Sequence, residues 1–315
     1  MTKAKSQGKK PSVAILGPGR LGLALAIALR ASGYPILAFV SKHADHARKA
    51  VELFNQSEKL VRPLASAGIA QLPATDLVLI TTPDDAIEET ARRLAELARP
   101  KGKTRHRTVL HTSGALSSAV LAPLADAGFH TGSFHPLISV SEPRAGAEAL
   151  RGAFYCVEGD ASAIRIARQI VRDLRGKSFS IQPENKALYH AAAVMASPHL
   201  VALFDLAIEM LAACGLSKRK AKEILLPLLE TTLNNLKATE TRRALTGTFA
   251  RGDLATVKRH LSALSAREIA GALEIYKLLG LHSIQLASRN GIDEKLLKQI
   301  RQVLKSTNTS KKRPG

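Results

Sequence analysis

Histidine and lysine side chains at three places in the sequence have the chemistry needed to donate a proton. His111 and His135 each end an apolar, strand-like run, and Lys186 and His190 lie four residues apart in a helical pattern. Histidine exchanges protons near neutral pH, and lysine does so when burial lowers its pKa. Lys186, His190 and His135 are therefore the candidate catalytic residues. An exposed lysine and structural histidines are the alternatives, and the fold decides between them.

A glycine-rich turn near the start of the chain has the spacing of a dinucleotide-binding loop. An apolar run at 13–16 precedes it, and an Ala- and Leu-rich helical pattern follows. The first glycine permits a tight turn, the second lets the backbone approach a pyrophosphate, and the third lets the helix pack on the strand. The phosphates would then meet a helix N-terminus. The predicted cofactor contacts in this loop are Gly17, Pro18, Gly19, Arg20, Leu21 and Gly22.

The end of the second strand-like run, at 35–40, predicts which dinucleotide binds. NAD-binding proteins typically place Asp or Glu there, whereas this sequence has Ser41 and Lys42. A hydroxyl and a cation suit a 2′-phosphate, so NADP is the predicted cofactor. A solvated basic loop is the alternative. Thr82 and Pro83 end a further buried run and would lie beside the cofactor.

Polar residues at two further places are candidate substrate contacts. Ligands of open α/β sheets bind outside the carboxyl ends of strands, where His111 and Ser113 would converge with His135. In the second half of the chain, Asn235 interrupts an apolar helix and Arg251 follows a glycine-containing turn. Arg251 could hold a substrate carboxylate in a two-point fork, and an ion pair at a helix start is the alternative. No metal site is predicted, because no third ligand accompanies the histidines.

A sheet followed by helices would position these residues. Strand-like runs alternate with helical patterns over 11–182, which predicts an α/β Rossmann domain with a doubly wound, mainly parallel sheet. Strand signals then stop, and an all-helical second domain is predicted over 183–305. Its helical patterns cover about 184–214, 217–240, 253–281 and 293–305, and basic segments at 1–10 and 306–315 are predicted tails.

Composition excludes several classes of function. The 315 residues carry a formal net charge of +20, which suits solubility and attraction of anionic ligands. With no tryptophan and 4% aromatic residues, few side chains could stack on single-stranded nucleic acid, so no specific nucleic-acid partner is predicted. No signal peptide and no membrane-spanning run is expected, which predicts a cytoplasmic protein without a membrane partner. Cys156 and Cys214 are predicted to be buried, inert thiols.

The sequence resembles bacterial Rossmann-like proteins that carry the domain of unknown function 2520, relatives of reductases with a 6-phosphogluconate dehydrogenase C-terminal-like domain. The resemblance covers nearly the whole chain and rests on the glycine loop and seven further motifs. These motifs lie at 82–85, 111–114, 133–136, 158–160, 189–193, 245–247 and 251–253. Relatives with this architecture include ketopantoate and pyrroline-carboxylate reductases. The resemblance implies an NADP-dependent reductase whose helical domain covers the nicotinamide and often mediates dimerisation.

The resulting prediction is an NADP-dependent oxidoreductase that transfers a hydride to a small anionic oxo or imino acid in a cleft between the domains. A ketopantoate-like substrate follows by analogy, and a homodimer is the expected assembly. Two positions depart from the pattern of similar proteins, which usually have Asn in place of Pro198 and Pro in place of Thr248. Pro198 also removes a backbone donor from a helix. The alternative is therefore a non-catalytic NADP-binding protein with a regulatory or scaffold role.

Overall fold

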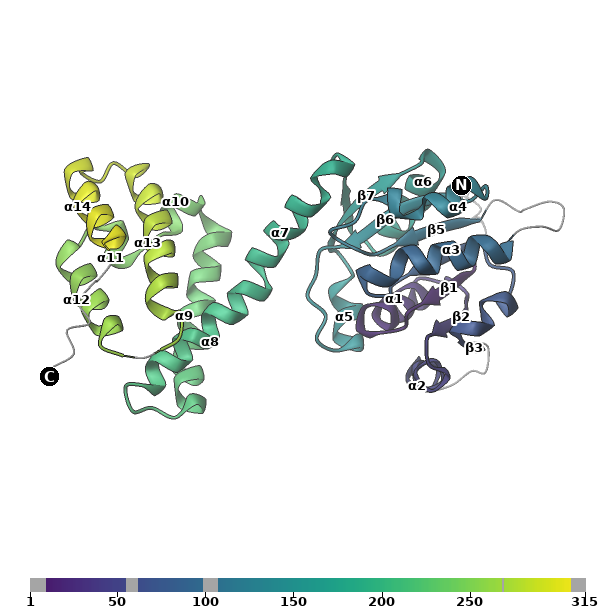
Figure 1. Ribbon diagram of the computed structural model, residues 1–315, viewed down its shortest axis with the longest axis horizontal. Coiled ribbons are helices and arrows are strands. Elements are labelled where there is room, and N and C mark those ends of the chain that lie inside the picture. Colours follow the sequence, from purple (N-terminus) through teal and green to yellow (C-terminus); the bar gives the residue numbers. More distant parts are fainter. Residues whose placement is uncertain (1–9, 55–61, 99–106, 268, 307–315) are drawn as a thin grey trace, which may run out of the picture. The chain divides into compact units, whose positions relative to one another are not determined.

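The computed structural model describes residues 10–54, 62–98, 107–267 and 269–306 (Figure 1). The chain divides into two compact units, Met1–Ser197 and Pro198–Gly315. The two predicted basic tails lie almost wholly outside the described residues.

The described strands of the first unit form one sheet of eight strands, in the order β3-β2-β1-β4-β5-β6-β7-β8. They are β1 (Val13–Leu16), β2 (Ile36–Ser41), β3 (Arg62–Ala65), β4 (Leu77–Ile80), β5 (Thr108–His111), β6 (His130–Pro136), β7 (Phe154–Gly159) and β8 (Lys177–Phe179). All neighbouring pairs are parallel except β6 and β7. The strand order turns back between β1 and β4, which confirms the predicted doubly wound, mainly parallel sheet. Only β3 falls in a stretch without a predicted strand.

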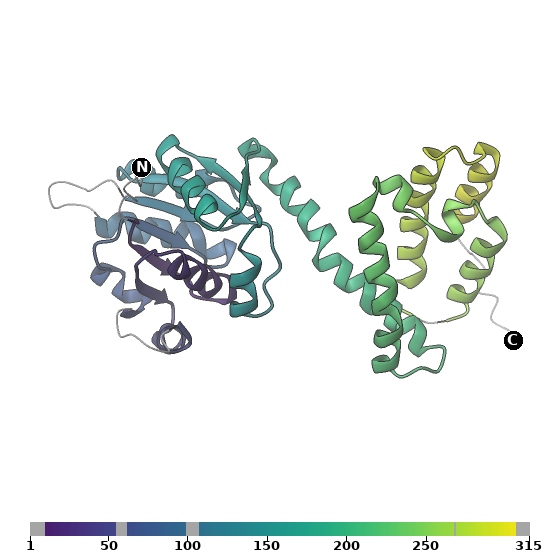
Figure 2. The ribbon, with the colours of Figure 1, turned by 180° about the vertical axis from the view of Figure 1, so that it is seen from behind.

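Helices cover both faces of this sheet because alternate residues of its buried strands face opposite sides. Val13 and Ile15 belong to one core, with α1, α5 and α6, whereas Ala14 and Leu16 belong to the other, with α3 and α4. Helix α3 accordingly crosses the side seen in Figure 1, and α1 lies on the side seen in Figure 2. The helices of this unit are α1 (Arg20–Ala31), α2 (Ala44–Phe54), α3 (Ile87–Ala98), α4 (Ala122–Asp126), α5 (Pro143–Ala149), α6 (Ala161–Asp173) and α7 (Lys186–Ala196).

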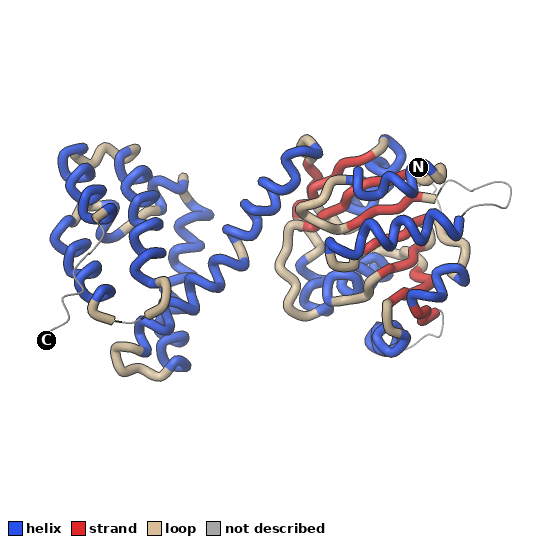
Figure 3. The backbone as a smooth tube through the Cα atoms, in the orientation of Figure 1, coloured by secondary structure: helices blue, strands red, loops and turns tan. Residues whose placement is uncertain are grey.

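The described part of the second unit contains helices and no strand, as predicted (Figure 3). Its helices are α8 (Pro198–Ala212), α9 (Lys218–Ala238), α10 (Thr241–Ala244), α11 (Gly247–Ala250), α12 (Leu254–Ser265), α13 (Ala272–Ser288) and α14 (Glu294–Lys305). Val257, Ile284 and Ile300 are fully buried where α12, α13 and α14 pack together. The single helix predicted over 253–281 is wrong, because the chain leaves the helix after Ser265 and Gly271 takes a left-handed φ of +74° before α13.

The predicted division at residue 182 falls before the boundary in the structure. Helix α7 belongs to the first unit, since the side chain of Lys186 in its first turn is buried and hydrogen-bonded to the sheet.

The prediction of a buried thiol is wrong for one of the two cysteines. Cys156 is buried on β7, whereas Cys214 is exposed after α8.

One helical stretch among the described residues, Pro183–Ala212, is long and apolar enough to cross a membrane by length and composition alone. The expectation that no run reaches this length is therefore wrong. Near its start, the buried Nζ of Lys186 donates hydrogen bonds to Ser113 and Ser133. Leu188, Met195 and Val201 are 73%, 63% and 68% exposed. The predicted homodimer stays a prediction.

Candidate functional site

The glycine-rich loop joins β1 to α1 in a conformation that depends on two of its glycines. Gly17 has a φ of +89°, and a Cβ there would lie 2.7 Å from the amide nitrogen of Thr82. The Thr81 hydroxyl donates to the Gly17 carbonyl at 2.6 Å and ties the loop to the end of β4. A Cβ on Gly22 would lie 2.4 Å from Oγ1 of Thr81, so close packing of α1 requires glycine there. A Cβ on Gly19, in contrast, would meet nothing within 4 Å.

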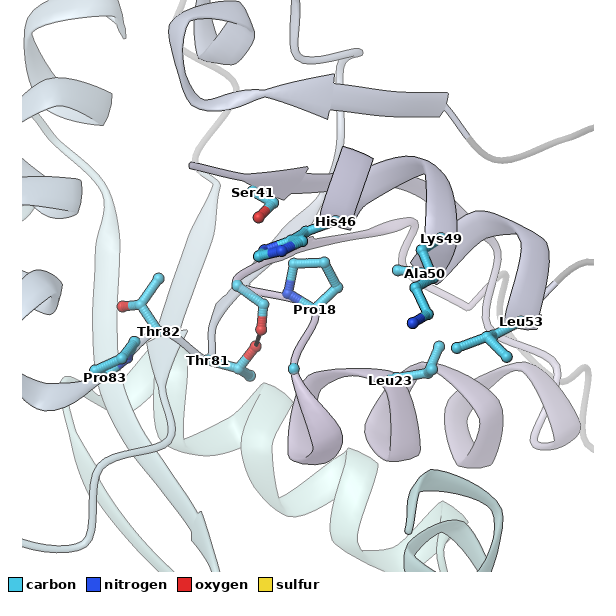
Figure 4. Close-up of a pocket in the computed structure, with 12 residues that line it drawn as sticks. Pro18, Leu23, Ser41, His46, Lys49, Ala50, Leu53, Thr81, Thr82 and Pro83 are labelled. Carbon is cyan, nitrogen blue, oxygen red and sulfur yellow. Dashed lines mark hydrogen bonds between the residues drawn. The ribbon is translucent and has the colours of Figure 1, made fainter. Parts of the chain in front are cut away.

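A pocket of about 530 Å³ opens beside this loop (Figure 4). Its lining residues are Gly17, Pro18, Gly19, Leu23, Ser41, His46, Lys49, Ala50, Leu53, Thr81, Thr82 and Pro83. No side chain caps the first turn of α1, which leaves its amide groups available to an anion. Oγ1 of Thr82 is buried without a hydrogen-bond partner among the described residues. An open helix N-terminus and an unsatisfied hydroxyl in one pocket fit the pyrophosphate of a dinucleotide.

The basic residues that line this pocket differ from those expected. Ser41 lines the pocket, but Lys42 and Arg20 are exposed and do not belong to its lining. His46 and Lys49 line it instead, and Figure 4 shows Lys49 extending from α2 toward α1. Neither residue is among the predicted cofactor contacts, because both lie on α2, beyond the strand end from which those contacts are predicted. Their spacing of three within a helical pattern, which places them on one face, is the signal that could have found them.

One hydrogen bond joins the pocket to a second polar cluster. Pro83 lines the pocket, and the carboxylate of the next residue, Asp84, accepts from Oγ of Ser113 at 2.8 Å. The same oxygen of Ser113 accepts from the amides of Ala115 and Leu116 at 3.1 and 3.0 Å. Ser113 is therefore held firmly just beyond β5, at the sheet edge on which the pocket opens.

The buried ammonium of Lys186 lies at the centre of this second cluster. The residue is 1% exposed, and its Nζ donates to the Ser113 carbonyl at 3.2 Å and to Oγ of Ser133 at 2.9 Å. Burial lowers the pKa of Lys186, while the negative charges of Glu158 and Asp84 partly offset this effect. The two carboxylate oxygens of Glu158 accept hydrogen bonds at 2.7 Å from the amide and the hydroxyl of Ser118. Among the described residues, no carboxylate is hydrogen-bonded to the buried Nζ of Lys186.

His135, Tyr189 and His190 form an aromatic group beside Lys186. Nδ1 of His135 lies 2.7 Å from the Tyr189 hydroxyl, and the rings of His135 and His190 meet edge to face with centroids 5.8 Å apart. Gly114 makes room for both histidines, because a Cβ there would lie 2.4 Å from Cδ2 of His190 and 2.8 Å from Nε2 of His135. The three aromatic side chains are partly exposed, so a ligand can reach them.

The two histidines at strand ends are uncharged at neutral pH. Burial, reinforced by the charge of Lys186, lowers the pKa of His111 to about 4 and that of His135 to about 3. His111 is fully buried, and its Nδ1 accepts from the amide of Ser113 at 3.2 Å. His111 thus lies behind Ser113, whereas His135 reaches the surface of the cluster.

The remaining predicted contacts lie elsewhere in the chain. Leu21 is partly buried in the first turn of α1. Asn235 is exposed on α9, and Arg251 is exposed directly after α11 in the second unit. The carboxylate of Asp253 caps α12 by accepting from the amide of Thr256 at 2.9 Å. In the part of the chain that the structure describes, no three His, Cys, Asp or Glu residues are arranged to hold a metal ion.

The fold and the pocket define the class of this protein. A doubly wound sheet with a glycine loop at its first strand end is the Rossmann architecture, in which dinucleotides bind at this edge. Residues 1–136 match the family model of the Rossmann-like domain, and residues 153–283 match that of the domain of unknown function DUF2520. The chain therefore combines a Rossmann-like domain with a DUF2520 domain. The comparison with curated proteins finds no match.

Solved structures share this fold over most of their length. Protein TM1727 from Thermotoga maritima is 25% identical with a TM-score of 0.67, over 89% of this chain and 99% of its own. The 1-pyrroline-5-carboxylate reductase of Streptococcus pyogenes is 14% identical with a TM-score of 0.57, over 94% of this chain and 100% of its own. The reductive aminase of Aspergillus terreus, solved in complex with NADPH, is 17% identical with a TM-score of 0.53, over 94% of this chain and 92% of its own. The fold is thus one that NADP-dependent reductases use.

Proposed function

We propose that this protein is an NADP-dependent reductase that transfers a hydride to a small anionic oxo or imino acid. The observation that carries the proposal is the buried Lys186 ammonium beside Ser113, at the same sheet edge as the dinucleotide pocket. A buried charge is costly unless something compensates it, and an anionic substrate group would do so. The fold shared with NADP-dependent reductases supports the reaction class.

The residues of the pocket fit NADP(H), which when bound would supply the hydride. The amides of the first turn of α1 and the Thr82 hydroxyl would hold the pyrophosphate, and the open space at Gly19 would let it approach. Ser41, His46 and Lys49 offer a hydroxyl, an imidazole and an ammonium group to the 2′-phosphate.

The second cluster would bind and polarise the substrate. Lys186 would attract its carboxylate or its developing negative charge, and His135 would donate a hydrogen bond to the accepting group. His190 lies against the ring of His135 and remains a second candidate proton donor.

The reaction is tested by mixing the purified protein and NADPH with a panel of oxo acids, ketopantoate among them, and cyclic imino acids. We expect NADPH absorbance to fall with at least one anionic substrate and not with its uncharged ester. Tight NADPH binding without turnover on any member of the panel would instead support the non-catalytic alternative that Pro198 suggested.

Cofactor choice is predicted to depend on helix α2. We expect NADPH to bind at least about 10-fold more tightly than NADH, and Lys49→Ala to weaken NADPH binding by about 10-fold, as for loss of one charge-assisted hydrogen bond. Affinity for NADH should stay within about 3-fold, because that cofactor lacks the 2′-phosphate. Fluorescence titration measures both constants.

Lys42→Ala is the matched control, since Lys42 is an exposed lysine outside the pocket lining. A larger loss of NADPH affinity in Lys42→Ala than in Lys49→Ala would indicate that the 2′-phosphate binds at the end of β2. Equal loss of NADPH and NADH affinity in Lys49→Ala would show that this lysine does not bind the 2′-phosphate.

A further inference from the structure

Tyr189 belongs to the second cluster, but it is neither a contact of the glycine loop nor a candidate proton donor. Its hydroxyl lies 2.7 Å from Nδ1 of His135, although 54 residues separate the two in the chain. We propose that Tyr189 is a positioning residue that donates a hydrogen bond to Nδ1 and so keeps the proton of His135 on Nε2. The imidazole then presents an N–H to the oxo or imino group of the substrate, a role that rests on the proposed function.

The direction of this hydrogen bond follows from the chemistry of its two groups. A neutral imidazole has one N–H and one lone pair, and the nitrogen with the lone pair is a good acceptor. The phenol of Tyr189 keeps its proton, because burial raises its pKa well above the ordinary value. Among the described residues its hydroxyl has no other hydrogen-bond partner, so its proton is hydrogen-bonded there only if the hydroxyl donates to Nδ1. The remaining proton of the imidazole must then be on Nε2.

The surroundings of Nε2 leave that N–H for a ligand. Gly114 borders it, and even one methyl group added there would come within 2.8 Å of Nε2. Lys186, His190 and His111 are the titratable groups whose charge bears on His135, and none of them accepts a hydrogen bond from its Nε2. Tyr189 is itself held in place, since its ring also packs edge to face against Phe179, with centroids 5.8 Å apart. A neutral N–H aimed at the reacting group stabilises developing negative charge without first losing a proton.

The tautomer can be measured without substrate, which separates this proposal from the proposed reaction. In the full-length protein with ¹⁵N-labelled histidine, we expect the His135 signals to show a protonated Nε2 and an unprotonated Nδ1 at neutral pH. In Tyr189→Phe we expect both tautomers to be populated. Protonated Nδ1 in the wild type, or the same tautomer in wild type and Tyr189→Phe, would overturn the proposal even if the protein reduces oxo acids.

Kinetics provide a second test once a substrate is found. Tyr189→Phe should lower kcat about 3- to 10-fold, the effect of one hydrogen bond, with a smaller change in KM. In His135→Gln the side-chain amide supplies an N–H in place of Nε2–H, and an amide has no second tautomer to populate. Adding Tyr189→Phe to this variant should therefore change kcat less than 2-fold. Such a reduced effect is expected when two residues act through one interaction. An equal loss of kcat in both backgrounds would assign Tyr189 a merely structural role.

The second unit contains a matched control pair. The Tyr276 hydroxyl lies 2.8 Å from Nδ1 of His260 and its ring also meets that histidine edge to face. Tyr276→Phe removes the same kind of hydrogen bond and should leave kcat and the His135 tautomer unchanged. A shift of the His135 signals in Tyr276→Phe would mean that such changes are transmitted generally and do not report a direct contact.

Discussion

Lys186→Met is expected to lower kcat/KM for the reduction by at least about 100-fold, because it removes the buried cation that would bind the substrate's negative charge. Methionine has a similar length and no charge to desolvate. The hydrogen bonds to Ser113 and Ser133 contribute about 1 kcal/mol each, and the cost of burying an ammonium is several kcal/mol. The melting temperature should therefore be unchanged or higher. Steady-state kinetics and thermal unfolding measure the two effects.

Two controls make this result specific. NADPH affinity of Lys186→Met should stay within about 3-fold of the wild type, because Lys186 does not line the dinucleotide pocket. Lys298→Met replaces an exposed lysine of α14 and should change neither activity nor stability. Wild-type turnover in Lys186→Met would show that Lys186 has no role in the proposed reaction. A large loss of stability would show that the ammonium makes a net stabilising contribution to the fold.

Gly17→Ala is expected to destabilise the first unit by about 2 to 5 kcal/mol. Its Cβ would lie 2.7 to 2.9 Å from backbone atoms of Thr81 and Thr82, and its φ of +89° is strained for alanine. Backbone strain and overpacking each cost about 1 to 3 kcal/mol, and the contacted atoms are backbone atoms, which cannot turn aside as a flexible side chain can. The free energy of unfolding from urea titration, followed by circular dichroism, measures this loss.

Gly19→Ala is the matched control two residues away. Its Cβ would meet nothing within 4 Å, and its φ of −73° suits alanine, so stability should change by less than about 1 kcal/mol. The same methyl group would stand where the pyrophosphate has to approach, so NADPH affinity should fall at least about 10-fold. If Gly19→Ala binds NADPH like the wild type, the cofactor does not lie against this loop.

Much of the first unit could be predicted because its signals are local. Four buried apolar residues followed by Gly17 predict a strand and a tight turn without reference to the rest of the chain. Helix α1, Arg20–Ala31, follows the turn, as its Ala- and Leu-rich helical pattern predicts. Strand β3 was missed because its sequence, Arg-Pro-Leu-Ala, lacks an apolar run and forms a strand by pairing with β2.

The candidate site was harder to predict because its contacts are distant in sequence. The histidines and Lys186 were found by residue type, but nothing local predicts that the Lys186 ammonium is buried between Ser113 and Ser133. The pairing of Tyr189 with His135 depends on how α7 packs against β6.

The sequence by itself determined the doubly wound sheet, the helical second unit and the residue types available for chemistry, because periodicity and glycine spacing act over a few residues. Only the tertiary structure decided which of these residues meet. It lines the pocket with His46 and Lys49 and not with Lys42, places His111 behind Ser113 and brings Tyr189 to His135. The physical reason is that hydrogen bonds and burial depend on distances between strand ends, which the packing of the sheet sets and no local pattern records.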